Sequence, residues 1–304
     1  MKSLLPTILI SLTLGVGLAL YSELVTAQEN TYLSDITIRE QDRQYRLFVP
    51  SSYDKSQSMP VVLNFHGTSA SPAQQVEISN IETLAQQHGF IAVSPAAIYR
   101  RTPEGPKTWN VDKDPLGVDD VFFVQTLIAQ LKQQYNVDNN GIYAMGFSGG
   151  ARMSSRLACD LSKQIAAIGP VAGVRFPEDC HPARVVPVIT FHGKKDGVNH
   201  YVANDDSPPY WRMGVEPAIS GWLDNNHCVK QAQNTDLGEQ VTRLTYSQCQ
   251  DHGDVIFYQS TRAGHTWPGS KMADKLASYG LGATDKHIPA TELIWSFFKE
   301  HPLQ

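Results

Sequence analysis

Apolar and polar residues follow two different periods along the chain. Residues 36–38 and 45–49 alternate between apolar and polar, as in a β-hairpin with one face in water. Residues 60–65 are almost all apolar, which is typical of a strand covered on both faces. From there on, helical spacing alternates with short apolar runs. We expect helices at 78–88, 119–135, 149–161, 215–225 and 290–299, and strands at 90–94, 141–145, 165–171, 185–191, 241–246 and 255–259.

This alternation of strands and helices predicts an α/β fold. A mostly parallel central sheet is expected, with right-handed crossovers and helices on both faces. The opening hairpin is expected to supply antiparallel strands at one edge. In sheets of this kind, sites lie beyond the carboxyl ends of the strands, so the residues that follow each strand are the first candidates for chemistry.

The first 27 residues have the character of an export signal. Lys2 gives a positive start, residues 4–20 are apolar, and small residues precede Gln28. A retained membrane anchor is the alternative, because the apolar run approaches the length of a transmembrane helix. Proline, glycine and hydroxyl residues within the run favour cleavage. We therefore expect residues 1–27 to be a signal peptide and residues 28–304 to form one α/β domain, secreted or periplasmic and without stable membrane association.

Composition narrows the choice of partners. With 41% hydrophobic and 18% charged residues, the chain can bury a large core. The formal net charge is −5 and the basic residues are scattered, so nucleic acid is not an expected partner.

Four cysteines lie in the exported part: Cys159, Cys180, Cys228 and Cys249. No C-x-x-C spacing is present, so no metal site is expected. In an oxidising compartment, two local disulfides are the natural expectation. Cys159–Cys180 and Cys228–Cys249 are favoured, since each closes a short loop worth roughly 3 kcal/mol. The two other connectivities stay open.

Residues 146–150, with the sequence GFSGG, fit the pattern G-x-S-x-G between an apolar run and a helical stretch. A sharp strand-to-helix turn exposes the serine Oγ and aims the next backbone N–H at the place where an oxyanion forms. Glycines flank the serine because such a turn is cramped. The motif predicts that Ser148 is the nucleophile of a serine hydrolase.

An acid and a histidine are expected to follow the serine in chain order. Asp196 lies just after the predicted strand at 185–191, although Lys-Asp-Gly is also ordinary turn sequence. His265 follows the strand at 255–259 in a loop rich in glycine and proline, which could hold an imidazole rigidly. We therefore expect Asp196 to orient His265, and His265 to act as the base.

Two backbone amides are expected to bind the oxyanion. One belongs to Gly149, directly after the nucleophile, and the other to Thr68, in the loop after the strand at 60–65. Gly67 allows the backbone of that loop to turn inward. A serine mechanism of this kind needs no metal or organic cofactor.

Three other polar residues compete for catalytic roles. His66 could be a base, but it precedes the serine in the chain, so structural hydrogen bonds are expected instead. Asp119 and Asp120 stand at a predicted helix start, where carboxylates cap free N–H groups.

Two tryptophans lie on loops near these residues. Trp109 and Trp267 could form an aromatic wall that binds substrate over the site. Both could equally be packing anchors, and the sequence leaves the two interpretations open.

Taken together, the chain resembles the secreted esterases of the polyhydroxybutyrate-depolymerase type, a group that includes feruloyl and acetyl xylan esterases. The resemblance runs from about Tyr45 to the last helix and rests on five motifs in the same order, at residues 62–67, 117–121, 146–153, 192–196 and 264–269. It implies an α/β-hydrolase fold, a triad of Ser148, Asp196 and His265, and a disulfide-like position for Cys228 and Cys249.

The substrate implied by the resemblance is a carboxylic ester, either a feruloyl or acetyl ester of plant polysaccharide or a hydroxyalkanoate oligomer. Many relatives have two cysteines where this chain has Thr68 and Thr108. Their absence predicts a lost crosslink and a freer loop around Trp109. A serine peptidase on the same fold and a non-catalytic binding protein are the alternatives. A peptidase would usually need an added domain or an acidic cluster to hold a peptide amine, and the sequence shows neither. A binding protein would typically have lost the serine, the acid or the histidine, and all three are present.

Overall fold

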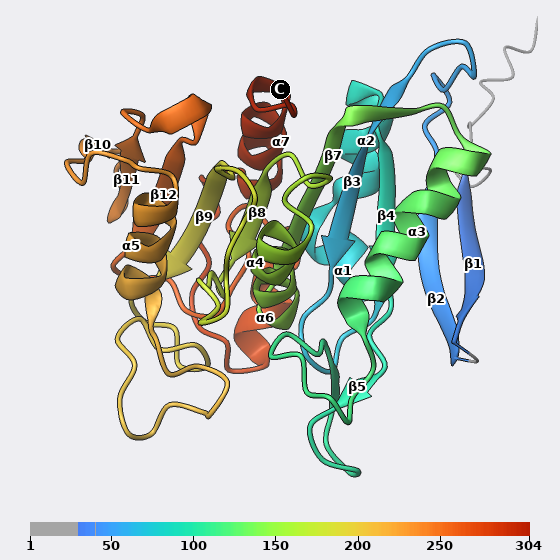
Figure 1. Ribbon diagram of the computed structural model, residues 1–304. Helices are drawn as coiled ribbons and strands as arrows, with labels where there is room; N and C mark the ends of the chain where they lie inside the picture. Colours follow the sequence, from blue (N-terminus) through green and yellow to red (C-terminus); the bar gives the residue numbers. More distant parts are fainter. Residues whose placement is uncertain (1–29, 40) are drawn as a thin grey trace, which may run out of the picture.

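The computed structural model describes residues 30–39 and 41–304 (Figure 1). The signal peptide predicted for residues 1–27 lies outside the described residues. In the part that is described, no helix is long and apolar enough to cross a membrane.

A ten-stranded sheet runs through the described part of the chain, in the order β1-β2-β4-β3-β7-β8-β9-β12-β11-β10 (Figure 1). Neighbouring strands are parallel from β4 to β12, and the pairs at both edges are antiparallel. The predicted α/β fold with an antiparallel N-terminal hairpin is confirmed. The strands are β1 (Thr31–Ile38), β2 (Gln41–Phe48), β3 (Met59–Phe65), β4 (Ile91–Pro95), β7 (Val137–Phe147), β8 (Ile168–Val171), β9 (Val188–Gly193), β10 (Gln233–Asp236), β11 (Val241–Tyr246) and β12 (Val255–Ser260).

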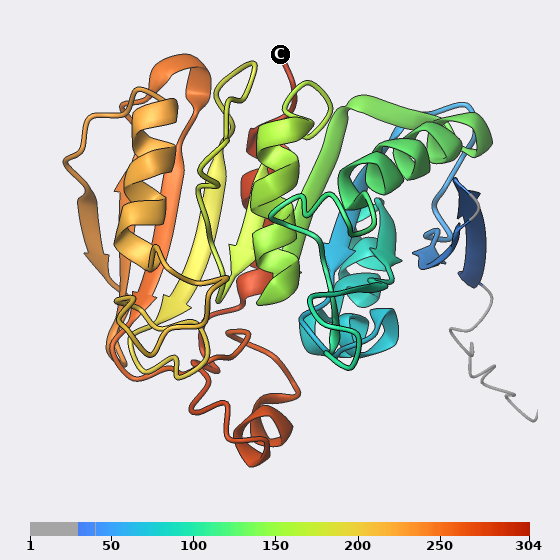
Figure 2. The same ribbon diagram turned by 60° about the horizontal axis from the view of Figure 1, so that its bottom comes forward.

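Helices cover both faces of the sheet. α3, α4 and α5 lie on one face, and α1, α2 and α7 lie on the other (Figures 1 and 2). The helices are α1 (Pro72–Ser79), α2 (Ile81–His88), α3 (Asp120–Gln134), α4 (Gly149–Asp160), α5 (Val215–Asn225), α6 (Ala273–Ser278) and α7 (Ala290–Glu300). A separate two-stranded ribbon, β5 (Tyr99–Arg100) and β6 (Lys107–Thr108), and a short 3₁₀ helix at Gln250–His252 complete the described elements.

Strand β3 shows why its sequence is almost continuously apolar. Val61, Leu63 and Phe65 belong to the core cluster that contains residues of α3, α4 and α5. Val62 points the other way, into the cluster formed with α2 and α7. Because side chains alternate between faces and both faces are covered, every position of a central strand must be compatible with burial.

The helix predicted at 78–88 is interrupted: residues 78 and 79 end α1, which begins at Pro72, and α2 begins at Ile81. Asn80 ends α1 and precedes α2 with a φ of 54°, which turns the chain into the left-handed region. Asparagine tolerates that conformation better than most residues with a Cβ. The predicted hairpin is also longer than expected, because β1 begins at Thr31. The strand alternation is absent from the start of β1 because the apolar residues there, Tyr32 and Leu33, are exposed.

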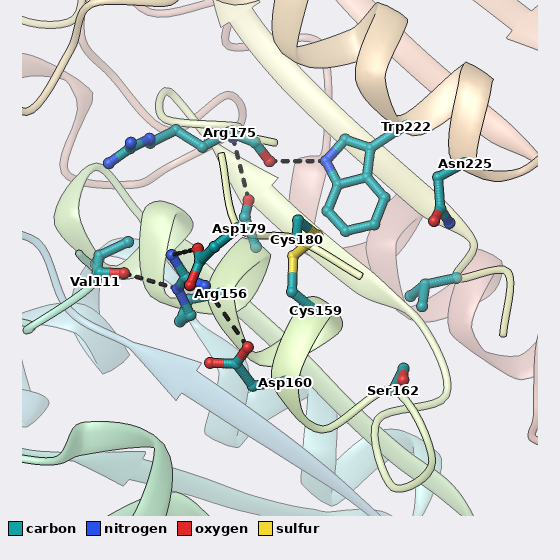
Figure 3. Close-up of a disulfide and its surroundings, with 12 residues drawn as sticks. Val111, Arg156, Cys159, Asp160, Ser162, Arg175, Asp179, Cys180, Trp222 and Asn225 are labelled. Carbon is teal, nitrogen blue, oxygen red and sulfur yellow. Dashed lines mark hydrogen bonds and ion pairs between the residues drawn. A yellow bond between two sulfur atoms is a disulfide. The ribbon is translucent and has the colours of Figure 1, made fainter. Parts of the chain in front are cut away.

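Both favoured disulfides are present, Cys159–Cys180 and Cys228–Cys249. Figure 3 shows the first, which joins the end of α4 to the segment after β8. Beside it, Arg156 donates to the carbonyl of Val111 at 2.7 Å and pairs with Asp179 at 2.7 Å. The outer end of α4 is thus tied both to the loop before α3 and to the segment that follows β8.

Candidate active site

Ser148 occupies the turn between β7 and α4. Its φ of 56° and ψ of −112° lie in a region that residues with a Cβ rarely adopt. The Ser148 N–H donates to the carbonyl of Val171 at 2.9 Å, which helps to hold the turn. This is the strained strand-to-helix turn that the G-x-S-x-G motif predicts.

The flanking glycines allow the turn to press against the end of β3. A Cβ on Gly150 would lie 2.0 Å from the carbonyl oxygen of Phe65, and one on Gly146 would lie 2.7 Å from the same atom. Real side chains do not approach backbone that closely. The glycines therefore let the nucleophile turn and the loop after β3 share one small volume.

The loop after β3 brings Thr68 to the nucleophile. A Cβ on Gly67 would lie 3.4 Å from the Cβ of Ser148, and one on Gly149 would lie 3.1 Å from the backbone nitrogen of Thr68. Within the described residues, the N–H groups of Thr68 and Gly149 donate to no protein acceptor. Two neighbouring amides without acceptors are what an oxyanion hole requires.

Asp196 and His265 meet at the same edge of the sheet. Asp196 follows β9 and His265 follows β12, and His265 Nδ1 lies 2.7 Å from Asp196 Oδ2. Both residues are buried. The backbone N–H groups of Val198 and Asn199 donate to Asp196 Oδ1, each at 2.8 Å. The carboxylate is therefore held in one orientation, with one oxygen directed at the imidazole.

The imidazole of His265 lies beside the nucleophile turn. Its ring centre is 4.9 Å from that of Phe147, the residue directly before Ser148. The loop that carries His265 is held by a backbone hydrogen bond, in which the His265 N–H donates to the carbonyl of Leu281 at 2.7 Å. No hydrogen bond joins Ser148 to His265 in the described structure. In hydrolases without substrate this bond is often long, and it shortens when substrate binds.

His192 is a part of this cluster to which the sequence analysis assigned no role. Its Nε2 lies 2.9 Å from the carbonyl of Asn199 and 3.3 Å from Asp196 Oδ2, the oxygen that His265 also contacts. Its ring stacks on that of Trp211, with centres 5.9 Å apart. The signal in the sequence was its position four residues before Asp196, near the end of β9.

The surroundings of Asp196 favour its charged form. Burial by itself would raise the pKa of this carboxyl. Electrostatic attraction to the imidazole of His265 and the hydrogen bonds from His192 and His265 outweigh that effect and hold the pKa of Asp196 well below its ordinary value of 3.8. Asp196 is thus an anion at neutral pH, as an orienting acid must be.

The competing polar residues have structural contacts. His66 Nδ1 lies 2.7 Å from the carbonyl of Gly67, and its Nε2 accepts from the N–H of Ala97 at 3.0 Å. Burial lowers the pKa of His66 to about 4, against a small opposing effect of the Gly67 hydrogen bond. With both ring nitrogens occupied, His66 has the structural role expected for it.

The two aspartates at the start of α3 differ. Asp119 caps the helix, because its side chain accepts from the N–H of Phe122 at 2.9 Å. Asp120 does not cap it. This buried carboxylate pairs with Arg43 at 2.6 Å and accepts from the N–H of Asn110 at 2.7 Å. The capping expected for Asp120 is wrong, because a cation from β2 reaches it through the core.

The aromatic wall expected from Trp109 and Trp267 is not formed. Trp109 is 0% exposed and Trp267 is 1% exposed, so neither ring is placed to contact a substrate. The indole of Trp109 donates to the carbonyl of His66 at 2.8 Å, and that of Trp267 donates to Thr291 at 3.0 Å. Both are packing anchors, because each indole N–H finds an acceptor inside the fold.

The loop around Trp109 is held without a crosslink between positions 68 and 108. The hydroxyl oxygens of Thr68 and Thr108 lie 2.8 Å apart and are hydrogen-bonded. The N–H of Ser69 also donates to the carbonyl of Lys107 at 2.9 Å. The expected lack of a crosslink is confirmed, and the freer loop stays a prediction. Hydrogen bonds and a buried indole join the two segments in place of a crosslink.

Comparison with known proteins identifies the family of this chain. The sequence profile of the family described as "Esterase PHB depolymerase" matches residues 43–255. The chain belongs to this family. Its matched region contains β2 to the start of β12, including the nucleophile turn and Asp196, and it ends before the loop of His265.

Two curated relatives of this family member are esterases by name. One is a bifunctional acetylxylan esterase/xylanase of Neocallimastix patriciarum, 30% identical over 62% of this chain and 25% of that protein. The other is feruloyl esterase B of Piromyces equi, 27% identical over 73% of this chain and 42% of that protein. The chain thus spans less than half of the length of either relative.

Solved structures support the fold. An acetyl xylan esterase from Aspergillus awamori superposes with a TM-score of 0.57 at 15% identity, over 83% of this chain and all of that one. An S-formylglutathione hydrolase from Agrobacterium tumefaciens gives 0.54 at 11% identity, over 87% of this chain and 93% of that one. At such low identities the likeness shows the α/β-hydrolase fold and nothing finer.

Replacing Gly150 by alanine is expected to prevent folding or to lower the free energy of unfolding by at least ~4 kcal/mol, because the new Cβ would overlap the carbonyl of Phe65. Urea denaturation and soluble yield measure the effect. Gly197→Ala is the matched control, since no atom lies within 4 Å of the Cβ position there, and it should change stability by less than ~0.5 kcal/mol. An unchanged urea midpoint for Gly150→Ala would contradict the close contact.

The depressed pKa of Asp196 predicts a pH-dependent contribution to stability. The unfolded carboxyl binds a proton near pH 3.8 while the folded one does not, so the contribution is fully present above that pH and is lost as pH falls toward the folded pKa. Asp196→Asn lacks this contribution. The difference in unfolding free energy between wild type and Asp196→Asn should therefore stay constant down to about pH 5 and shrink below that pH in denaturation experiments. A difference that is also constant below that pH would show that the carboxylate is not stabilised by its partners.

Proposed function

We propose that this chain is a serine esterase that hydrolyses carboxylic esters through an acyl-enzyme, with Ser148, His265 and Asp196 as its triad. The observation that carries the proposal is the buried 2.7 Å contact between His265 and Asp196, at the sheet edge where the strained Ser148 lies. Both amides expected to bind an oxyanion lie beside that serine. The two esterases named above support the same chemistry.

In the proposed reaction, Ser148 Oγ attacks the ester carbonyl while His265 accepts its proton. Asp196 keeps His265 Nδ1 protonated and directed away from the serine, so that Nε2 faces the reacting hydroxyl. The amides of Thr68 and Gly149 donate to the developing oxyanion. His265 then gives the proton to the leaving alcohol, and a water molecule repeats the sequence to release the acid.

The proposed substrates are feruloyl or acetyl esters of plant polysaccharides, or hydroxyalkanoate oligomers. The names of the curated relatives support the first two, and the family description supports the third. The two disulfides support a secreted or periplasmic enzyme, because such bonds persist in oxidising compartments.

Ser148→Ala is expected to lose on the order of 10⁶ in kcat for p-nitrophenyl butyrate, as in other hydrolases without their nucleophile. It should also no longer react with a fluorophosphonate probe, whereas wild type should be labelled on Ser148. Ser154→Ala is the control, since this buried serine of α4 donates only to its own helix, at Gly150. Labelling of Ser148→Ala at the wild-type rate would exclude Ser148 as the nucleophile.

A panel of methyl ferulate, acetylated xylan and hydroxybutyrate trimer is expected to separate the substrate classes. The proposal predicts that one class exceeds the others by at least ~10-fold in kcat/KM, because pocket contacts of one extra group typically change this ratio by that amount or more. Product release followed by chromatography measures it. Hydrolysis of none of the three, with p-nitrophenyl butyrate still cleaved, would reject these substrates and keep the esterase.

A further inference from the structure

The hydrogen-bonded threonine pair lies at the oxyanion site. Thr68 is in the loop after β3 and is partly exposed, whereas Thr108 ends β6 and is only 3% exposed. A Cβ on Gly149 would lie 2.9 Å from Thr68 Oγ1, 3.1 Å from Thr68 N and 3.2 Å from Thr108 Oγ1. Both hydroxyls therefore face the residue whose N–H is expected to bind the oxyanion, on the same side as the N–H of Thr68.

Counting protons assigns a direction to the bond between the two hydroxyls. Each hydroxyl carries one proton, and the 2.8 Å bond uses one of the two. Neither hydroxyl makes another hydrogen bond within the described residues. If Thr68 were the donor, the proton of buried Thr108 would have no acceptor, which costs free energy. Thr108 is therefore the donor, and the proton of partly exposed Thr68 remains available.

We propose that the Thr68 hydroxyl is a third donor to the oxyanion, beside the amides of Thr68 and Gly149, and that Thr108 is the positioning residue that orients it. The inference rests on the proposed esterase function and deepens it. No proton is transferred in this role. The Thr68 O–H bond stays intact and donates a hydrogen bond that strengthens as negative charge develops on the carbonyl oxygen.

The geometry also explains why a threonine suits position 68. Its β-branched side chain has few rotamers, so a bond to a buried partner suffices to fix the hydroxyl. A valine has nearly the same shape, has no hydroxyl and keeps the backbone N–H. A Thr68→Val variant therefore measures the contribution of the hydroxyl separately from that of the backbone N–H.

Thr68→Val is expected to lower kcat for p-nitrophenyl butyrate by about 10²-fold, the size typical of losing one oxyanion donor, with little change in KM. Thr68→Ser should recover most of that loss. Thr108→Val should lower kcat less, by about 10-fold, because Thr68 keeps its hydroxyl and loses only its orientation. Thr126→Val in α3, whose hydroxyl donates to the carbonyl of Phe122, is the control and should retain wild-type kcat.

The double variant Thr68→Val/Thr108→Val separates catalysis from stability. Thr68→Val by itself leaves the buried hydroxyl of Thr108 without a partner, so its melting temperature should fall. Removing both hydroxyls should restore the melting temperature, because an apolar pair needs no hydrogen bond. The kcat should remain as low as that of Thr68→Val. Recovery of kcat together with stability would overturn the proposal.

Inhibition by a trifluoromethyl ketone provides a second measurement, because its adduct with Ser148 carries an oxyanion. The inhibition constant should rise in Thr68→Val by the same factor by which kcat/KM falls. An unchanged constant in a folded Thr68→Val would also overturn the proposal, and if that variant does not fold, the double variant decides. Wild-type protein that neither cleaves the ester nor reacts with a fluorophosphonate would refute the esterase function itself.

Discussion

The close contact between the backbone of Gly150 and the carbonyl of Phe65 is the constraint on which the site depends. Because Gly150 has no Cβ, the start of α4 can lie directly against the end of β3. That contact brings Ser148 beside the loop of Gly67 and Thr68, although about 80 residues separate them in the chain. The nucleophile and the proposed oxyanion donors are thus placed by the packing of two parallel strands, and the positive φ of Ser148 is strain that this packing maintains.

A second close contact builds the other half of the site. A Cβ on Gly193 would lie 2.1 Å from the carbonyl of Ala263, so the loops that hold Asp196 and His265 can touch. Asn199 then links the halves. Its N–H donates to Asp196, its side-chain amide donates to the carbonyl of Ala172, and its oxygen accepts from Arg152 of α4 at 3.1 Å. The acid loop is therefore tied to the helix that begins at the nucleophile.

Around this centre, polar side chains are used for position. Thr68 and Thr108 join two segments with a hydrogen bond. A hydrogen-bonded pair of hydroxyls holds the segments less rigidly than a covalent bond. In the proposed role, however, the hydroxyl proton of Thr68 stays available to donate to the oxyanion, and a disulfide has no such proton. His192 serves in a comparable way beneath the carboxylate, held between Trp211 and Asn199. In both cases a side chain outside the proposed triad hydrogen-bonds or packs against a group at the proposed site.

The amino-acid sequence by itself predicted the α/β fold and the positions of Ser148, Asp196 and His265 after three of its strands, and it favoured the two disulfide pairs that the structure contains. These follow from local periods, from chain order and from glycines at turns, all of which depend on near neighbours. The tertiary structure decided the rest. Trp109 and Trp267 became buried anchors, Asp120 gained Arg43, and a left-handed Asn80 divided a predicted helix. Each outcome depends on residues brought from distant parts of the chain, because burial and ion pairing are properties of the packed molecule rather than of the local pattern.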